Sequence, residues 1–315
     1  MLRLIKFVFY RHFLRRKIPG VAILALTYRC QCQCVHCSAG RYKLKGEELT
    51  LSEWKAVIDE IDILGVPRIH LTGGEPLLKK EFLDIAEYAA GKGIPTFLET
   101  NGYSLTEEIV KRLKNSKIAS IDISIDSIDK KQHDELRGLP GSFEKAQEAM
   151  VLCRKYGMVH MVSTYATREN IYSGELNKII EWAKENRADA VRIMPPQPSG
   201  KWFNRFDIVL KKEDKSYLRA HFPFYPILDR TEIPQCPIKD KYTFFVAPEG
   251  EIYPCPHLPF SFGNVKRECI SEILAKMAAA EMFQRKSLCY INEPNFREKY
   301  IDPLIEKEKE LPLKI

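Results

Sequence analysis

The stretch TYRCQCQCVHCS, residues Thr27–Ser38, places four cysteines within eight residues. Three of these cysteines follow the spacing C-x3-C-x2-C, namely Cys30, Cys34 and Cys37, and Cys32 is left over. Three thiolates on so short a loop cannot be paired into disulfides without strain, but they can surround one compact metal centre. The spacing leaves two kinds of centre open: a tetrahedral zinc completed by His36, or an iron–sulfur cluster with three cysteine ligands and one open iron.

Length and composition exclude the disordered and fibrous classes. The chain has 315 residues, which is enough for one large α/β domain with or without a small appendage. Its 45% hydrophobic and 29% charged residues are typical of a globular protein. Nine cysteines, an odd number gathered in clusters, indicate cofactor ligands in a reducing compartment rather than a disulfide framework. We therefore expect a cytoplasmic protein.

The net charge of +7 is concentrated at the N-terminus. Residues 1–20 carry six Lys or Arg side chains and no acidic one, while the other residues carry 43 basic and 42 acidic side chains. A nucleic-acid-binding protein should show basic residues gathered across a face of its body. This distribution argues against nucleic acid as a partner.

Residues 1–20 form a separate N-terminal region. Residues 2–17 predict a helix whose apolar side chains spread nearly all the way round it. Two roles are open for this helix: docking on the protein's own body, which we favour, and peripheral contact with a membrane surface through residues 1–17. The apolar run that follows predicts a buried strand at residues 21–26, and no stretch is long enough to span a bilayer.

After the cysteine loop, apolar runs and helical patterns alternate along the chain. Six strands are expected at residues 21–26, 66–71, 94–99, 118–125, 158–164 and 190–194. Helices are expected between them at residues 51–64, 81–91, 106–115, 143–157 and 175–186, the first with a capping box at Thr50 and Glu53. Such alternation requires parallel strands joined by right-handed crossovers. Six units are too few for a closed eight-stranded barrel, so the sequence predicts an α/β fold with a partial (β/α)6 TIM-like barrel over residues 21–200.

In such a barrel the active residues lie at the carboxyl ends of the strands. The cysteine loop follows the first predicted strand directly, and the run TGGEP, Thr72–Pro76, follows the second. Gly73 and Gly74 allow the backbone to approach a ligand closely, and Pro76 fixes the turn. Glu75 offers a carboxylate at the strand end.

These segments together resemble the radical S-adenosylmethionine (SAM) enzymes. The resemblance covers about residues 21–200 and rests on motifs at four consecutive strand ends. The motifs are the loop of Cys30, Cys34 and Cys37, GGEP at Gly73–Pro76, TNG at Thr100–Gly102 with Asn101, and SID at Ser124–Asp126. The stretch from Asp126 that contains Arg137 also resembles the peptide- and sugar-modifying branch of the family. Four motifs at four strand ends favour the iron–sulfur cluster over zinc.

The resemblance implies a cofactor set and a role for each matching residue. Cys30, Cys34 and Cys37 would ligate a [4Fe–4S] cluster whose fourth iron is chelated by the amino and carboxylate groups of SAM. The Gly73–Pro76 turn would receive the amino group, and three residues would contact the ribose and carboxylate: Ser124, Asp126 and Arg137. His36 stands where the family usually has an aromatic residue, and its backbone could face the adenine. An electron donor such as flavodoxin or ferredoxin would reduce the cluster, and the 5′-deoxyadenosyl radical formed from SAM would abstract a hydrogen atom from the substrate.

Residues 201–235 are expected to connect this barrel to a C-terminal part. The chain becomes rich in proline and aromatic residues at 194–206 and 221–226, which predicts irregular structure and a wall of the substrate site. Three side chains here are candidates for anionic or backbone contacts, although a solvated loop is the simpler interpretation: Lys201, Trp202 and Arg205.

A second cysteine pattern, C-x13-G-x4-C, spans Cys236 to Cys255. A predicted hairpin of strands 242–247 and 251–253 lies between these cysteines, an arrangement that brings two thiolates together. Residues 236–290 resemble the auxiliary-cluster extension of radical SAM enzymes, called SPASM in its full form and twitch in its shortened form. The full form needs further cysteine pairs, whereas here only Cys269 and Cys289 remain.

The resemblance implies one auxiliary iron–sulfur cluster on Cys236, Cys255 and Cys289. Its fourth ligand is left open between Cys269, a residue other than cysteine, and a position that binds substrate. The alternative is that these thiols are structural or bind zinc. Cys153 is expected in the core, and residues 291–315 are expected to be a charged C-terminal tail.

The sequence thus predicts a radical SAM enzyme, but it does not name the substrate. Oxidation, epimerisation or cross-linking of a small molecule or a peptide is the first interpretation. A lipid or isoprenoid substrate at the membrane surface is an alternative, motivated by residues 1–17. A zinc- or cluster-binding scaffold without catalysis is the remaining class.

Overall fold

The computed structural model describes residues 2–14, 18–221, 227–229, 236, 238, 242–285, 287–303 and 313–314. The chain forms two compact units. Unit 1 comprises Met1–Arg29, Arg41–Phe97 and Pro234–Ile315, and unit 2 comprises Cys30–Gly40 and Leu98–Ile233. The predicted segments 222–226 and 304–312, and residues 15–17 of the predicted N-terminal helix, lie outside the described residues.

Unit 1 is built on four hydrogen-bonded strands. Strand β1 (Val21–Ala25) pairs in parallel with β2 (Ile69–Thr72) on one side and with β8 (Thr243–Val246) on the other, and β8 pairs antiparallel with β9 (Ile252–Tyr253). The helices of unit 1 are α1 (Leu2–Val8), α2 (Leu51–Ile63), α3 (Phe82–Gly91), α10 (Ile270–Ala279) and α11 (Pro294–Tyr300). A π-helical turn, Phe9–Phe13, extends α1, and the short strands β10 (Phe260–Ser261) and β11 (Leu313–Lys314) pair in parallel.

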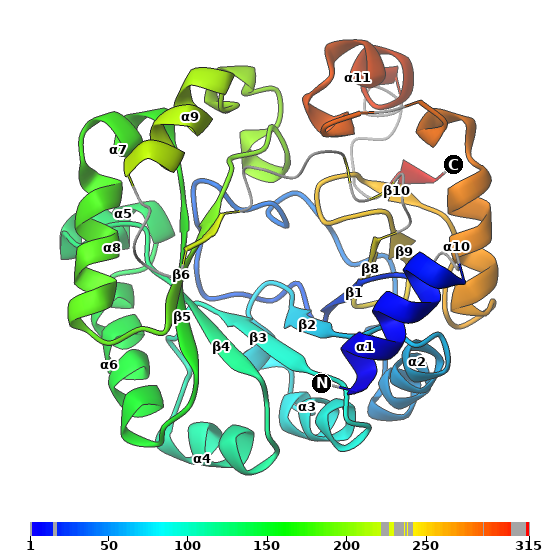
Figure 1. The fold of residues 1–315 in the computed structure, drawn as a ribbon, viewed down its shortest axis with the longest axis horizontal. Helices are drawn as coiled ribbons and strands as arrows, with labels where there is room; N and C mark the ends of the chain where they lie inside the picture. Colours follow the sequence, from blue (N-terminus) through cyan, green and yellow to red (C-terminus); the bar gives the residue numbers. More distant parts are fainter. Residues whose placement is uncertain are drawn as a thin grey trace. The chain divides into compact units, whose positions relative to one another are not determined.

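Unit 2 contains four parallel strands in sequential order. They are β4 (Ser120–Ser124), β5 (His160–Tyr165), β6 (Ala190–Met194) and β7 (Ile227–Asp229). Its helices are α4 (Glu107–Asn115), α5 (Lys130–Arg137), α6 (Ser142–Lys155), α7 (Arg168–Tyr172), α8 (Glu175–Glu185) and α9 (Lys212–His221). Figure 1 shows α4, α6 and α8 along the outer side of these strands. Strand β3 (Thr96–Thr100) has residues in both units.

Local sequence signals explain most of these elements. The capping box at Thr50 is present, because its side chain accepts from Glu53 N while the Glu53 carboxylate accepts from Thr50 N. Strand β4 is buried along four of its five residues, as expected for a parallel strand covered on both faces. The six predicted strands are all found within three residues of their expected bounds. Several elements were not predicted, among them strand β7 and helices α5, α7 and α9. The pairing of β8 with β1 was not predicted either.

The pairing of β8 with β1 places an aromatic cluster in the core of unit 1. Ala25, Phe245, Ala247 and Tyr253 are buried together. Tyr42 stacks on Tyr253 with ring centroids 5.8 Å apart. The C-terminal hairpin is therefore an integral part of the sheet in unit 1. In the part of the chain that the structure describes, no helix is both long and apolar enough to cross a membrane.

The two glycines of the TGGEP run are needed because their backbone lies against the end of β1. A Cβ atom on Gly73 would lie 2.3 Å from the carbonyl oxygen of Thr27, and one on Gly74 would lie 2.4 Å from that of Arg29. Gly73 also has a φ of +149°, which side chains rarely allow. The glycines thus let the chain fold tightly onto the residues that lead into the cysteine loop.

We predict that Gly73→Ala lowers the free energy of unfolding by about 3 kcal/mol or more, since it adds a backbone clash to an unfavourable φ. Gly93→Ala is the matched control, because Gly93 also has a positive φ but a Cβ there meets nothing within 4 Å. The control should cost only about 1 kcal/mol. Urea unfolding measures both values, and equal losses would contradict the close-approach explanation.

Candidate functional site

The cysteine loop of unit 2 is held by the last turn of helix α5. The backbone N–H of Gln33 donates to Arg137 O at 2.8 Å, and that of Val35 donates to Leu136 O at 3.0 Å. Between these two bonds lies Cys34, whose side chain is buried, whereas Cys30 is exposed and Cys37 is half-buried. The loop is therefore fixed at its middle cysteine, and the thiols on either side are more accessible.

Arg137 connects the cysteine loop to a buried carboxylate. Its guanidinium lies 2.7 Å from Asp126 Oδ2, and Nη1 donates to Cys34 Sγ at 3.7 Å. His36 Nε2 lies 3.3 Å from the same Asp126 oxygen. All three side chains are less than 10% exposed. Two residues that the resemblance assigned to SAM, Asp126 and Arg137, thus contact each other and the loop directly.

The protonation states of this group follow from burial and from the Arg137 charge. Burial opposes the charge of Asp126, but the Arg137 guanidinium and smaller contributions from other neighbours, among them the Tyr165 N–H, together outweigh it and lower the pKa of the carboxyl group. Burial lowers the pKa of His36 to about 4, so its imidazole is neutral at pH 7. A hydrogen bond from the Cys32 thiol, together with Arg137, lowers the pKa of Cys34. Hydrogen bonds with the sulfurs of Cys30 and Cys34 raise the pKa of Cys32. Cys34 is accordingly the thiol of this pair that ionises first.

The surroundings of His36 do not suit a zinc ligand. Its ring packs against Tyr165 with centroids 4.6 Å apart and against Trp202 at 5.6 Å. A cubane cluster offers a separate iron to each thiolate, so its ligands need not converge on one point. Three thiols on one loop, one of them beside a cation, therefore fit a cluster better than they fit a single zinc.

Asn101, from the TNG motif, also lies at this loop. Its Nδ2 group donates to Cys32 Sγ at 3.4 Å and to Cys30 Sγ at 3.8 Å. Its Oδ1 accepts from Tyr103 N at 2.8 Å, which fixes the orientation of the amide. Ser124 is the last residue of β4 and is paired in register with Ser163 of β5. Unit 2 therefore brings Asn101 to the cysteines and places Ser124 at a strand end.

The segment after β6 braces the cysteine loop through Lys201, which was one of the three candidates for anionic or backbone contacts. The Lys201 N–H donates to Cys37 O at 3.0 Å, and its side-chain ammonium donates to Gln33 O at 2.9 Å. Gly200 has a φ of +56°, and a Cβ on it would lie 2.1 Å from Cys37 O. The sequence feature that could have indicated this close approach to the loop is Gly200, a glycine that comes shortly after the end of β6. Arg205, the other basic candidate here, instead pairs with the exposed Asp207.

In unit 1 the Gly73–Pro76 turn is hydrogen-bonded to the chain just before Cys30. Gly74 N donates to Thr27 O at 2.7 Å, and Glu75 N donates to Arg29 O at 2.8 Å. The Glu75 side chain is buried and accepts from Leu77 N, so it caps the following turn. The Gly73–Pro76 turn is thus a rigid structure at the carboxyl end of β2.

The three cysteines predicted to hold an auxiliary cluster lie near one another in unit 1. Burial raises the pKa of Cys255, and Cys236 and Cys289 raise it further. Burial, with a contribution from Cys236, raises the pKa of Cys289 to about 12. Each sulfur accepts from backbone N–H groups: Ile238 and Tyr290 at Cys236, His257 and Leu258 at Cys255, Ile291 and Asn292 at Cys289.

This donor set fits an iron–sulfur cluster. Burial alone keeps the three thiols protonated at neutral pH, whereas the N–H groups favour thiolates. A bound metal centre resolves this conflict, because it supplies the positive charge that ionises the thiols. Cys269 is exposed and occupies the N-cap of α10, and Cys153 is buried in α6.

Comparison with protein families gives two matches. A model described as the radical SAM superfamily matches residues 24–190. A model described as an iron-sulfur cluster-binding domain, SPASM, matches residues 236–297.

The chain is also similar to proteins of known name and structure. An AdoMet-dependent heme synthase of Methanosarcina barkeri is 29% identical over 303 residues, covering 85% of this chain and 84% of that protein. A PqqA peptide cyclase of Bradyrhizobium diazoefficiens is 29% identical over 184 residues, covering 58% of this chain and 48% of that protein. The structure of Streptococcus suis SuiB bound to the precursor peptide SuiA has a TM-score of 0.69 at 14% identity, covering 84% of this chain and 67% of that one.

We predict that Asp126→Asn lowers the free energy of unfolding of the metal-free protein by about 3–5 kcal/mol, because it leaves Arg137 buried without its counter-charge. Asp207→Asn is the matched control, since it removes an exposed carboxylate from Arg205. The control should leave the free energy of unfolding nearly unchanged, because water and salt screen an exposed ion pair. A similarly small loss for both variants in urea titrations would show that the buried pair is not a structural constraint.

Proposed function

Because the chain belongs to the radical SAM superfamily, we propose that Cys30, Cys34 and Cys37 hold its SAM-binding [4Fe–4S] cluster and that the enzyme abstracts a substrate hydrogen atom after reductive cleavage of SAM. The cysteine loop carries the proposal, because Arg137 and Asn101 donate hydrogen bonds to its sulfurs. Such donors stabilise thiolates and are among the features that set the potential of an iron–sulfur cluster.

Membership of the superfamily confirms several predictions made from the sequence. The fold is a parallel-rich α/β sheet that is not closed into a barrel, and it is similar to the folds of related solved structures. The chain is an enzyme, with a SAM-binding [4Fe–4S] cluster and further iron–sulfur ligation in a SPASM-type part. The predicted resemblance to a radical SAM enzyme with such an extension was therefore correct.

The protein's own residues bind and orient the reactants in this proposal. When bound, the cluster supplies the electron that cleaves SAM. Arg137 carries the positive charge suited to the carboxylate of SAM, and Asp126 holds that guanidinium in place through their 2.7 Å contact. The backbone of Gly73–Pro76 receives the amino group. The packed rings of His36, Tyr165 and Trp202 keep water from this side of the cysteine loop.

We assign the auxiliary cluster to Cys236, Cys255 and Cys289. Their burial, their mutual effect on pKa and their backbone N–H donors support the assignment. A second cluster provides an acceptor for the electron that remains on a substrate after hydrogen abstraction. The reaction is therefore proposed to be an oxidation of the substrate.

A heme-type tetrapyrrole is the proposed substrate class. Its support is the similarity to the AdoMet-dependent heme synthase, which extends over more than four fifths of both chains. A peptide is the second candidate, supported by the PqqA peptide cyclase and by the peptide-bound SuiB structure. The peptide cyclase is matched over less of its length, so we place the tetrapyrrole first.

We predict that the anaerobically reconstituted protein, reduced with dithionite, forms 5′-deoxyadenosine from SAM and that Cys34→Ala abolishes this product. Cys153→Ala is the control, because Cys153 is a buried thiol of α6 with no proposed ligand role. Liquid chromatography measures the product, and addition of an iron tetrapyrrole should raise its yield more than addition of a peptide. Product formation by Cys34→Ala at the level of the control would contradict the ligand assignment.

Iron analysis of the same preparations tests the auxiliary assignment. We predict about eight irons per chain in the parent protein and about four in Cys255→Ala, since each [4Fe–4S] cluster carries four irons. An unchanged iron content in Cys255→Ala would remove Cys255 from the ligand set.

A further inference from the structure

The N-terminal segment Leu2–Leu14 is fixed to unit 1 by one side of its helix. Arg3, Phe7 and Arg11 are spaced four residues apart and therefore share that side. Arg3 Nε donates to Val66 O at 3.0 Å, and its guanidinium lies 2.6 Å from Asp62 Oδ1. The favoured prediction for this segment, docking on the protein's own body, agrees with these contacts.

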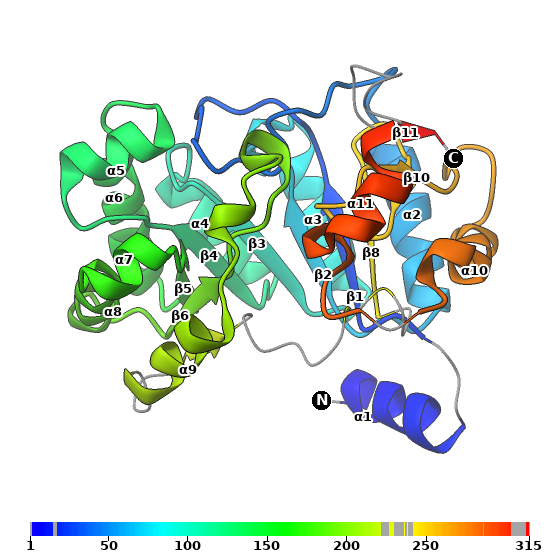
Figure 2. The ribbon, with the colours of Figure 1, turned by 90° about the horizontal axis from the view of Figure 1, so that it is seen from above.

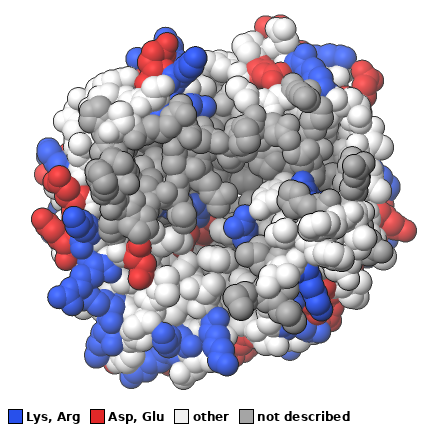
Figure 3. Space-filling view, in the orientation of Figure 1, with Lys and Arg blue, Asp and Glu red and all other residues white. Residues whose placement is uncertain are grey.

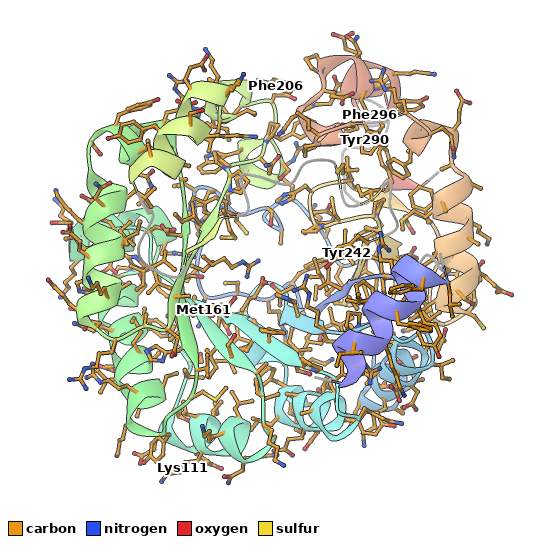
Figure 4. All side chains as sticks on the ribbon, in the orientation of Figure 1. Lys111, Met161, Phe206, Tyr242, Tyr290 and Phe296 are labelled. Carbon is orange, nitrogen blue, oxygen red and sulfur yellow. The ribbon has the colours of Figure 1, made fainter. Side chains whose placement is uncertain are left out.

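Tyr242 is the second anchor of the segment. The ring of Phe7 packs edge-on against the ring of Tyr242 with centroids 6.2 Å apart. The guanidinium of Arg11 lies 5.3 Å from the centroid of the same ring, and Nη1 donates to Ile18 O at 2.9 Å. Figure 4 labels Tyr242 beside α1. Docking thus uses two of the basic residues and one aromatic residue of the segment.

The other sides of the segment present apolar side chains to solvent. Five of them are exposed by 42–74%: Ile5, Val8, Phe9, Phe13 and Leu14. They are five of the thirteen large hydrophobic side chains exposed in the described part of the chain, and they fall within ten residues. The rings of Phe9 and Phe13 stack with centroids 5.5 Å apart, so they form one apolar surface. Figure 3 shows mostly uncharged atoms over α1, with basic side chains at the edge.

Charge identifies the surface that would cover these side chains. Residues 1–20 carry six basic side chains and no acidic one, and Lys6 is exposed among the apolar residues. Three further basic residues, Arg15, Arg16 and Lys17, follow directly in the sequence. A second copy of the chain is a poor partner, since a twofold contact through this face would bring like charges together. Anionic lipid offers both an apolar interior and negative charge.

The segment lies at the amino ends of the strands in its unit. Its anchors Val66, Ile18 and Tyr242 come shortly before β2, β1 and β8 respectively. The Gly73–Pro76 turn follows β2 at the opposite end, and Figure 2 shows α1 beyond the amino end of β1. Contact at α1 would therefore leave the Gly73–Pro76 turn uncovered.

We propose that residues 2–14 bind an anionic membrane surface through Ile5, Val8, Phe9, Phe13 and Leu14. The inserted side chains contribute apolar burial, and the basic residues attract anionic lipid headgroups. The surface recruits the enzyme without covering the Gly73–Pro76 turn of the same unit. The inference is therefore independent of the proposed reaction.

Cosedimentation of the full reconstituted protein with vesicles tests this inference. The parent protein should bind vesicles of mixed phosphatidylglycerol and phosphatidylcholine, and binding should weaken at high salt and on pure phosphatidylcholine. The double variant Phe9→Glu/Phe13→Glu should bind the mixed vesicles at least ~tenfold more weakly, because it replaces two inserted rings with two negative charges. Val151→Glu is the matched control, since Val151 is a 44% exposed side chain on α6 of unit 2.

The exposed positions of Phe9 and Phe13 keep the test interpretable, because neither ring belongs to the docking side. Circular dichroism and 5′-deoxyadenosine formation without vesicles should be unchanged in the double variant. Equal vesicle binding by the parent and the double variant would overturn the inference. The inference would also be overturned if sedimentation velocity without lipid showed a dimer of the parent protein and a monomer of the double variant. The apolar face would then be covered by a second copy of the chain.

Discussion

The buried ion pair between Asp126 and Arg137 is the interaction on which the cysteine loop depends. Arg137 ends helix α5, where its carbonyl accepts from Gln33 and its side chain reaches both Asp126 and Cys34. Asp126 comes two residues after the end of β4, so the pair ties the loop to the carboxyl end of that strand. Without its counter-charge, a guanidinium this deeply buried would be strongly destabilising. One ion pair therefore fixes the loop's position and also places a positive charge beside a ligand thiol.

The two sets of cysteines are prepared for metal in different ways. At the loop, a cation and side-chain donors lower the pKa of Cys34, and Asn101 donates to Cys30 and Cys32. At Cys236, Cys255 and Cys289, burial raises the pKa values and only backbone N–H groups favour the thiolates. A cluster at the loop has a more accessible ligand in Cys30, as a substrate-binding cluster requires. Among the auxiliary thiols Cys236 is buried and Cys255 and Cys289 are half-buried, so none of the three is as exposed as Cys30.

The sequence predicted the features that depend on local patterns. The alternation of strands and helices, the Thr50–Glu53 capping box and the strand at residues 190–194 are all in place. It did not predict the pairing of β8 with β1 or the contact of Lys201 with Cys37, because both join segments that are more than 150 residues apart. Helix α5 was missed because its eight residues are almost entirely polar and show no apolar period. Of the residues assigned to SAM, Asn101 and Arg137 donate to sulfurs of the cysteine loop, and Asp126 pairs with Arg137. Their roles toward SAM stay predictions.

Electron paramagnetic resonance of the reduced, reconstituted protein tests the central claim, that the cysteine loop holds a cluster with one iron open to SAM. We predict that adding SAM shifts the signal of one cluster in the parent protein, and that Cys34→Ala lacks this response while keeping a signal from the auxiliary cluster. A spectrum that SAM leaves unchanged in the parent protein, or an equal response in Cys34→Ala, would contradict the claim.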